Sequence, residues 1–358
     1  MKTYIKFLCK TFLNSFFYVL LVTLSLIFIL NLLTELEFFK EFKVNSLLPI
    51  YMSLLNSPTF IFELFPFIFL ISTQLFFISL FNNDELNIFK YSGLKNSKIL
   101  IILSSVSLIL GFFIVIIFYN FSSNLKNFYL DLKSSYTSDG KYLAVINKNG
   151  LWIKDLVGEN TLLINASKIE QNFIIDAYIS EFDKDFKIIK NIMSPKIDVK
   201  NKEWISYDSS VLMNDNENIK YNIYKVKTNF NYHIIQNLFS NLSSLSFLEL
   251  LELRKNYKQL NYSLVEVDLH LLKLVSFPLY LVLMTIFASI IMLNTKRFKS
   301  AILKISIGLF FSVIIYYLNN FFNILGQTEK INLTASVIGP LILLVLVNSY
   351  LVRKINAK

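Results

Sequence analysis

Long runs of apolar residues dominate both ends of the chain. Each run holds at least 20 residues and no more than one charged residue. A helix needs about 20 apolar residues to cross the hydrocarbon core of a bilayer, so each run predicts a transmembrane helix. The runs cover residues 12–33, 59–81, 99–121, 271–293, 301–322 and 333–352. The first ends in Thr34-Glu35-Leu36-Glu37, which is no signal-peptide cleavage site, so a retained helix is predicted.

The middle of the chain follows a different pattern. Apolar and polar residues alternate in 141–146, 161–169 and 219–226, as in half-buried strands. Turn residues follow at 147–150, 183–185 and 200–202. About eight short strands with tight turns favour a sandwich or jelly roll. The predicted fold is an α-helical membrane protein with six transmembrane helices and an inserted all-β domain of jelly-roll type.

These patterns predict four regions. Residues 1–120 hold the first three transmembrane helices, with a short cytoplasmic helix near 82–94. Residues 121–245 form the β-domain, 246–270 connecting helices, and 271–358 the last three transmembrane helices. At Ser246 the period becomes helical, and Glu249 three residues later completes a capping box.

The net charge of +10 reflects membrane topology. Cytoplasmic loops are enriched in Lys and Arg, and the flanks of alternate helices differ sharply. One set holds thirteen such residues: Lys2, Lys6, Lys10, Lys90, Lys95, Lys98, Lys296, Arg297, Lys299, Lys304, Arg353, Lys354 and Lys358. The other set holds three: Lys40, Lys43 and Lys330. Both termini are therefore predicted to be cytoplasmic, and residues 121–270, which have 18 basic and 18 acidic residues, to lie outside. No nucleic-acid partner is expected.

Motifs for catalysis are missing from the sequence. There is no Gly-x-x-x-x-Gly-Lys phosphate loop, no His-Glu-x-x-His and no Gly-x-Ser-x-Gly. The single cysteine, Cys9, forms no intrachain disulfide, and we interpret His233 and His270 as structural. No catalytic residue, metal site or bound cofactor is predicted for this chain.

Several motifs together resemble the permeases of the LptF/LptG family, which extract lipopolysaccharide from the inner membrane of Gram-negative bacteria. They are Pro58 to Gln74, Asn83 to Gly93, Gly150-Leu151-Trp152-Ile153-Lys154-Asp155, Ser276-Phe277-Pro278 and Gly339-Pro340. Their order covers essentially the whole chain. The Gly-Leu-Trp-x-Lys-Asp segment and the later Lys202-Glu203-Trp204 make the resemblance closest to the LptG member.

The resemblance implies a half-transporter in the bacterial inner membrane. Its expected partners are lipopolysaccharide, a second, LptF-like permease and a dimeric, LptB-like cytoplasmic ATPase that uses the ATP. A single-span LptC-like protein and a soluble LptA-like protein would bridge the periplasm. Two alternatives remain: a permease for another envelope lipid or lipoprotein, and a membrane-anchored binding or sensory module. Only short cytoplasmic segments are predicted, which argues against a sensor.

The cytoplasmic loop after the second helix supplies the candidates for ATPase coupling. Asp84 and Glu85 would open a short helix, where acids complement the helix dipole. The resemblance places a functional acid at Glu85, which would pair with a basic residue of the ATPase. Leu86, Phe89 and Tyr91 would fill a groove on the ATPase, and Gly93 would end the helix.

Lipid-contact candidates lie on the opposite side. Lys40 and Lys43 follow the first helix and would attract lipid phosphates or anchor the helix at the interface. Glu63 is a carboxylate within the second apolar run, functional or merely solvated near the interface. Strict alternation through 219–226 predicts that Tyr221 and Ile223 line the interior of the β-domain.

Other polar and aromatic residues receive structural interpretations. Gln74, Asn319 and Asn320 are expected to form hydrogen bonds between helices. Trp152 and Trp204 are expected to pack in the β-domain core.

Overall fold

A computed structural model describes residues 3–136, 151–170, 172–213, 218–232, 234–235, 241–259, 262–295 and 300–356. The predicted strand 141–146, the turn 147–150 and His233 lie outside the described residues. The chain divides into two compact units. The membrane unit comprises Met1–Lys126 with Val265–Lys358, and the β-unit comprises Asn127–Leu264.

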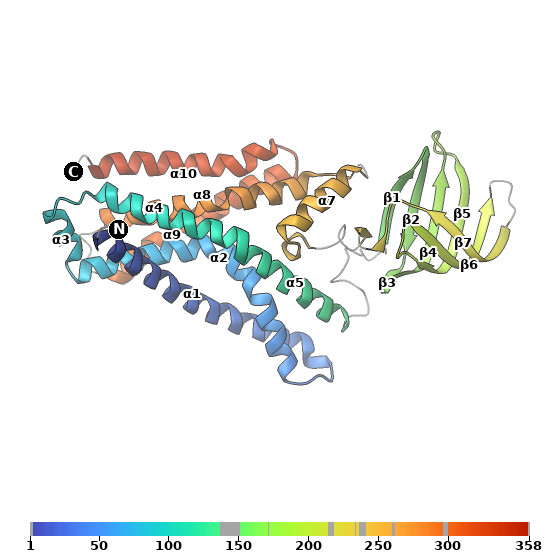
Figure 1. Cartoon of the computed structure of the whole chain (residues 1–358), viewed down its shortest axis with the longest axis horizontal. Helices are drawn as coiled ribbons and strands as arrows, with labels where there is room; N and C mark the ends of the chain where they lie inside the picture. The colour runs from blue at the N-terminus through green and yellow to red at the C-terminus, as the bar shows by residue number, and fades with distance from the viewer. Residues whose placement is uncertain are drawn as a thin grey trace. The chain divides into compact units, whose positions relative to one another are not determined.

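The described residues of the membrane unit include six segments long and apolar enough to cross a bilayer, as the sequence predicts. They are α1 (Thr3–Phe38), α2 (Leu47–Asn82), α4 (Asn96–Phe113) with its continuation, α8 (Val265–Asn294), α9 (Ala301–Gln327) and α10 (Leu333–Asn356). A π-helical turn, η2 (Ile114–Phe118), joins α4 to α5 (Tyr119–Ser134). A short 3-10 helix, η1 (Phe39–Glu41), follows α1, and the seven-residue α3 (Glu85–Tyr91) follows α2 (Figure 1).

Two helices run well past their predicted ends. Helix α2 begins at Leu47 instead of residue 59, and its added turns bury Met52 and Leu55. Helix α5 continues to Ser134, so 121–134 is helical and the prediction of β-structure there is wrong. Tyr129 and Leu130 are buried on this extension. The sequence of these extensions has only a weak helical pattern, and the burial of their apolar residues against other segments stabilises the helices.

Polar side chains tie the membrane helices together. Gln74 of α2 donates from Nε2 to the backbone carbonyl of Lys304 on α9 at 2.9 Å. The hydroxyls of Ser107 and Thr285 join α4 to α8 at 2.9 Å. Asn348 of α10 donates to the carbonyl of Leu283 on α8 at 3.1 Å. Such bonds between helices are favoured where water is absent, and the prediction for Gln74 is confirmed.

The β-unit contains a seven-stranded antiparallel sheet among its described residues. The strands are β1 (Leu151–Val157), β2 (Asn160–Ala166), β3 (Lys168–Glu170), β4 (Phe173–Phe182), β5 (Ile188–Asp198), β6 (Glu203–Met213) and β7 (Asn218–Lys227). Their order is β1-β2-β4-β5-β6-β7, with β3 paired to β4. The turns predicted at 183–185 and 200–202 separate β4 from β5 and β5 from β6. This order does not confirm the jelly-roll type.

Four neighbouring strands share one level at which the regular alternation of buried residues breaks, and we call this level the crease. Asp176 of β4 and Asp208 of β6 have left-handed backbone angles, with φ of 50° and 48°. Register places Pro195 of β5 between them and Asn222 of β7 beyond Asp208. Burial switches from one alternate set of residues to the other at this level, for example from Trp204 and Ser206 to Ser209 and Val211 in β6.

The two edges of the sheet meet at one point. Asp155 of β1 is buried and accepts hydrogen bonds from the backbone N–H and side-chain Nδ2 of Asn229, both at 2.8 Å. Asn229 follows β7, so the sheet curls until its first and last strands are joined. A 3-10 helix, η3 (Leu242–Ser244), and α7 (Phe247–Gln259) complete the unit. Ser246 and Glu249 form the predicted capping box, with Ser246 N–H donating to Glu249 at 2.7 Å.

Candidate coupling and lipid-contact sites

Helix α3 lies at the end of the membrane unit where α1 begins and α10 ends (Figure 1). It joins the end of α2 to the start of α4 and is flanked by the left-handed residues Asp84 and Gly93. These two residues turn the chain sharply on both sides of the helix. The short helix therefore lies across this end of the bundle instead of extending either neighbour.

The inner face of α3 is occupied by the chain itself. Leu86 is 1% exposed and belongs to the main core of the membrane unit. Phe89 packs against the same core, with its ring 5.9 Å from that of Phe7. The prediction that Leu86 fills a groove on another protein is therefore wrong, because its side chain is already buried.

The outer face of α3 carries Tyr91, which the sequence prediction named, and Ile88, which it missed. Ile88 is 58% exposed and Tyr91 is 92% exposed. They lie three residues apart and share one face of the helix. The signal for Ile88 was present in the sequence, because a helical residue two positions after Leu86 points away from it.

Gly93 ends α3 as predicted. Its φ of 77° is left-handed, its N–H donates to the carbonyl of Lys90 at 3.0 Å, and the N–H of Leu94 donates to the carbonyl of Phe89 at 2.9 Å. These two bonds form the Schellman motif, which favours glycine because a Cβ is strained at such an angle. The position of Gly93 thus has a local structural cause.

The two acids at the start of α3 differ in their surroundings. Asp84 is exposed and accepts a hydrogen bond from Asn87 at 2.6 Å. Glu85 is half-buried, and the Oε2 atom of its carboxylate is buried without a hydrogen-bond partner among the described residues. Leaving such an atom unsatisfied costs about 1–3 kcal/mol. The other oxygen of Glu85, Oε1, accepts a hydrogen bond from Nδ2 of Asn83 at 3.5 Å.

The carboxylate of Glu63 lies within electrostatic reach of two cations on other helices. Lys126 of α5 and Lys273 of α8 both interact with it. Lys126 also donates to the Oδ1 atom of Asn56 on α2 at 2.6 Å. Because α2 begins at Leu47, Glu63 lies several turns inside the helix and not near its end. The sequence prediction missed both lysines, which are distant from Glu63 along the chain.

Lys40 and Lys43 follow the end of α1, and both side chains are exposed. Glu35, one turn before the end of α1, is buried. The region after α1 therefore presents cations to its surroundings, while one of the acids that precede them is withdrawn into the protein.

Tyr221 and Ile223 lie on opposite faces of the sheet, on either side of the crease at Asn222. Tyr221 is half-buried and pairs with the buried Ser209. Ile223 is 61% exposed and pairs with Tyr207, on the face opposite Trp204. The crease at Asn222 breaks the strict alternation, so the prediction that both side chains line the interior is wrong for Ile223.

The two tryptophans also differ. Trp204 is fully buried, as predicted, and its indole N–H donates to the carbonyl of Phe230 at 2.9 Å. Trp152 is 58% exposed, so the prediction of core packing is wrong for it. In the Gly-Leu-Trp-x-Lys-Asp segment the buried anchors are Leu151, Ile153 and Asp155, which alternate along β1.

Tyr262 covers the edge of β1 beside that segment. The N–H of Lys154 donates to its phenol oxygen at 3.1 Å, and the phenol donates to the Lys154 carbonyl at 3.3 Å. Burial raises the pKa of Tyr262. The phenol therefore stays protonated and continues to donate well above neutral pH.

Gln74, Gly308 and Lys304 form a close contact between α2 and α9. Gln74 is fully buried, and Gly308 has no room for a Cβ because it would overlap the Gln74 amide. The ammonium group of Lys304 lies 4.5 Å from the centre of the Phe81 ring, near the end of α2 that leads to α3. This contact connects α9 to the helix that carries the coupling loop.

Six described helices are long and apolar enough to cross a bilayer, and the β-unit lies in the chain between the third and the fourth, as in a multi-pass membrane protein. The family model for the lipopolysaccharide export system permease LptF/LptG matches residues 6–354. The chain therefore belongs to the LptF/LptG family, whose members are inner-membrane transport subunits and not catalytic enzymes. A search of curated proteins found no match. The family match does not favour a sensory module or a permease for another lipid.

Proposed function

We propose that this chain is one permease subunit of a complex that extracts lipopolysaccharide from the inner membrane and passes it toward the outer membrane. The family match over nearly the whole chain carries this proposal. The sequence motifs favour the LptG-like role, in which an LptF-like permease is the partner. Depletion of the chain should trap lipopolysaccharide in the inner membrane, and complementation with the wild-type chain should restore its export. Normal export in depleted cells would refute the proposal.

The ATPase docks, in this proposal, on the outer face of α3. Ile88 and Tyr91 offer exposed apolar surface, and the carboxylate of Glu85 retains an unsatisfied oxygen. Apolar surface that is not covered by the chain itself, next to a half-buried acid, suits a partner with an apolar groove and a basic rim. Hydrolysis of ATP would then move α3, and with it the ends of α2 and α4.

Substitution of Glu85 tests this docking. Glu85→Lys should reduce the amount of ATPase that copurifies with the full chain, because it reverses the charge offered to the basic residue. Glu329→Lys makes the same change of charge at an exposed acid after α9, outside α3, and serves as the control. Equal copurification of the ATPase with both variants would assign Glu85 to the helix dipole alone.

In the proposed topology both termini and α3 are cytoplasmic and the β-unit is periplasmic. The Lys and Arg distribution around the spans supports it. In a Cys9→Ser background, a cysteine at Asp185 should react with an impermeant thiol reagent once the outer membrane is permeabilised. A cysteine at Tyr91 should react only after the inner membrane is opened. The reverse pattern would invert the topology.

The β-unit is proposed to receive acyl chains and pass them to LptC-like and LptA-like bridge proteins. We propose that two groups of residues contact lipid phosphates or sugars at the periplasmic surface of the inner membrane. One is the pair Lys40 and Lys43, and the other is the cluster of Glu63, Lys126 and Lys273. A photocrosslinker at Tyr221 should capture lipopolysaccharide when ATP is hydrolysed, and one at Ile223 should not. Equal capture at both positions would refute a one-faced lipid path.

A further inference from the structure

Helix α9 contacts α2 at three levels, and the two helices run in opposite directions. The rings of Phe67 on α2 and Tyr316 on α9 lie 5.9 Å apart. Further along α2, Gln74 donates to the carbonyl of Lys304, and the ammonium of Lys304 lies over the ring of Phe81. From residue 67 to residue 81, α2 rises about 21 Å at 1.5 Å per residue. The two helices are therefore joined along much of a membrane span.

Lys304 makes the contact that lies nearest to α3. Its side chain is buried, at 6% exposure, and none of the ion pairs formed between described residues includes it. A charge removed from water is costly unless another group stabilises it, and the face of an aromatic ring does so. That ring belongs to Phe81, the last residue but one of α2, and α3 begins at Glu85. The ammonium therefore holds α9 to the part of α2 that leads directly into α3.

The far end of α9 is joined to α10 instead. At Gly326 an added Cβ would overlap the side chain of Ser336, and at Gly339 it would lie 3.1 Å from the ring of Phe322. The two backbones therefore approach closely on either side of the turn that connects α9 to α10. This end of α9 is fixed to the helix that follows it.

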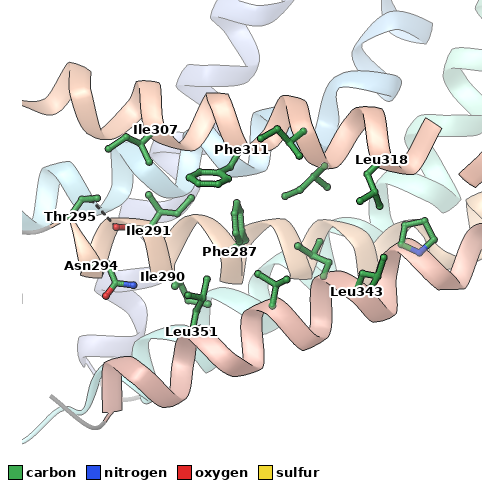
Figure 2. Close-up of a pocket in the computed structure, with 15 residues that line it drawn as sticks. Phe287, Ile290, Ile291, Asn294, Thr295, Ile307, Phe311, Leu318, Leu343 and Leu351 are labelled. Carbon is green, nitrogen blue, oxygen red and sulfur yellow. Dashed lines mark hydrogen bonds between the residues drawn. The ribbon is translucent and has the colours of Figure 1, made fainter. Parts of the chain in front are cut away.

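Nearer to α3, an apolar groove separates α9 from α10. Its volume is about 530 Å³. Figure 2 shows Ile307 and Phe311 of α9 on one side of the groove and Leu343 and Leu351 of α10 on the other, with Phe287 of α8 between them. Side chains of the described residues do not fill this space. Helix α9 thus has room on the side of α10 that it lacks on the side of α2.

We propose that Lys304 is a positioning residue that makes α9 follow α2 when ATP hydrolysis moves α3. This inference rests on the proposed docking of the ATPase on α3. A shift of the end of α2 carries Phe81, and Lys304 with it, while Gly326 stays beside α10. Helix α9 therefore tilts about its far end, and the groove takes up the movement.

Substitution of Lys304 tests this role in the reconstituted complex of both permeases and the ATPase. Lys304→Met keeps an apolar side chain of similar length but loses the charge over Phe81. We expect normal copurification of the ATPase and continued ATP hydrolysis, with several-fold less lipopolysaccharide released per ATP. Lys304→Arg should restore the release, because arginine also stacks on aromatic rings. Lys10→Met is the control, since it removes an exposed lysine from α1 at the same end of the unit.

Two crosslinks test the movement directly. In a Cys9→Ser background, paired cysteines are joined by a short, membrane-permeant bifunctional methanethiosulfonate. The pair Phe67→Cys and Tyr316→Cys joins α2 to α9, and its crosslink should leave release unchanged because these helices move together. The pair Ile307→Cys and Leu351→Cys joins α9 to α10 across the groove, and its crosslink should stop release. Each double variant without the crosslinker is its own control.

Three results would each overturn the proposal: full release in Lys304→Met, a loss that Lys304→Arg does not reverse, or full release with α9 crosslinked to α10. Lower melting temperature and lower ATPase copurification in Lys304→Met would show a merely structural role and would overturn it as well. A wild-type complex that hydrolyses ATP without releasing lipopolysaccharide would instead refute the proposed function. In that case the rate of crosslinking between positions 307 and 351 still reports the movement, and a rate that ATP does not change would refute the tilt of α9.

Discussion

The contact between Gln74 and Gly308 leads to a prediction about stability. The sign of the change in the free energy of unfolding on Gly308→Ala should depend on the residue at position 74. Gly308→Ala places a methyl group where the Gln74 amide lies, so the end of this fully buried side chain must move. The substitution should therefore break the hydrogen bond from Gln74 Nε2 to the carbonyl of Lys304. In a Gln74→Ala background the same methyl group meets an empty space.

The magnitude follows from three contributions. Overpacking of a well-packed site costs about 1–3 kcal/mol. Loss of a hydrogen bond between membrane helices costs about 0.6–1.7 kcal/mol. Glycine to alanine within a helix contributes the opposite sign, about 0.8–1 kcal/mol of stabilisation. Gly308→Ala should thus destabilise the wild type by about 1–4 kcal/mol and stabilise the Gln74→Ala variant by up to about 1 kcal/mol.

The assay is thermal denaturation of the wild type, Gly308→Ala, Gln74→Ala and the double variant in one detergent, measured as the loss of monodisperse protein on size exclusion. Export activity of each variant shows whether the spacing of α2 and α9 matters for function as well as for stability. The reasoning fails if Gly308→Ala has the same effect in both backgrounds, because the two residues would then not share a contact.

Three further outcomes concern the β-unit and α3. Both tryptophans lie in the β-unit, so tryptophan fluorescence of the full chain reports the unfolding of that unit. Asp155→Ala should lower the free energy of unfolding of the β-unit by about 2–4 kcal/mol, because two hydrogen bonds to a charged acceptor are lost. Asp155→Asn should cost less. Because burial raises the pKa of Tyr262, its stabilisation is present below the unfolded pKa of about 10 and declines as pH rises further, and Tyr262→Phe should remove that decline. Tyr91→Ala should weaken ATPase copurification without lowering the melting temperature. Leu86→Ala should lower the melting temperature, because it removes a core side chain. The same response in both variants would contradict the division of α3 into two faces.

The sequence by itself determined the elements that depend on local pattern. Six apolar runs of membrane length predicted six spans, because the hydrocarbon core accepts little else. The capping box at Ser246 and the glycine end of α3 were also predictable, since each depends on a few neighbouring residues. The family resemblance was carried by short motifs in a fixed order.

Tertiary structure decided which side chains are available. Leu86 and Ile88 are similar in sequence terms, yet one is buried in the membrane core and the other is exposed. The crease at Asp176, Pro195, Asp208 and Asn222 arises from the alignment of four strands, so alternation within one strand could not place Ile223.

The same holds for contacts between distant segments. Glu63 lies within electrostatic reach of Lys126 and Lys273, and Asp155 accepts a hydrogen bond from Asn229, across separations that no local pattern records. Local sequence fixes whether a segment is helical, extended or membrane-spanning, because those choices depend on neighbouring residues. Which faces are covered, and where charge and empty space remain, depends on how the segments pack, and packing is a property of the whole chain.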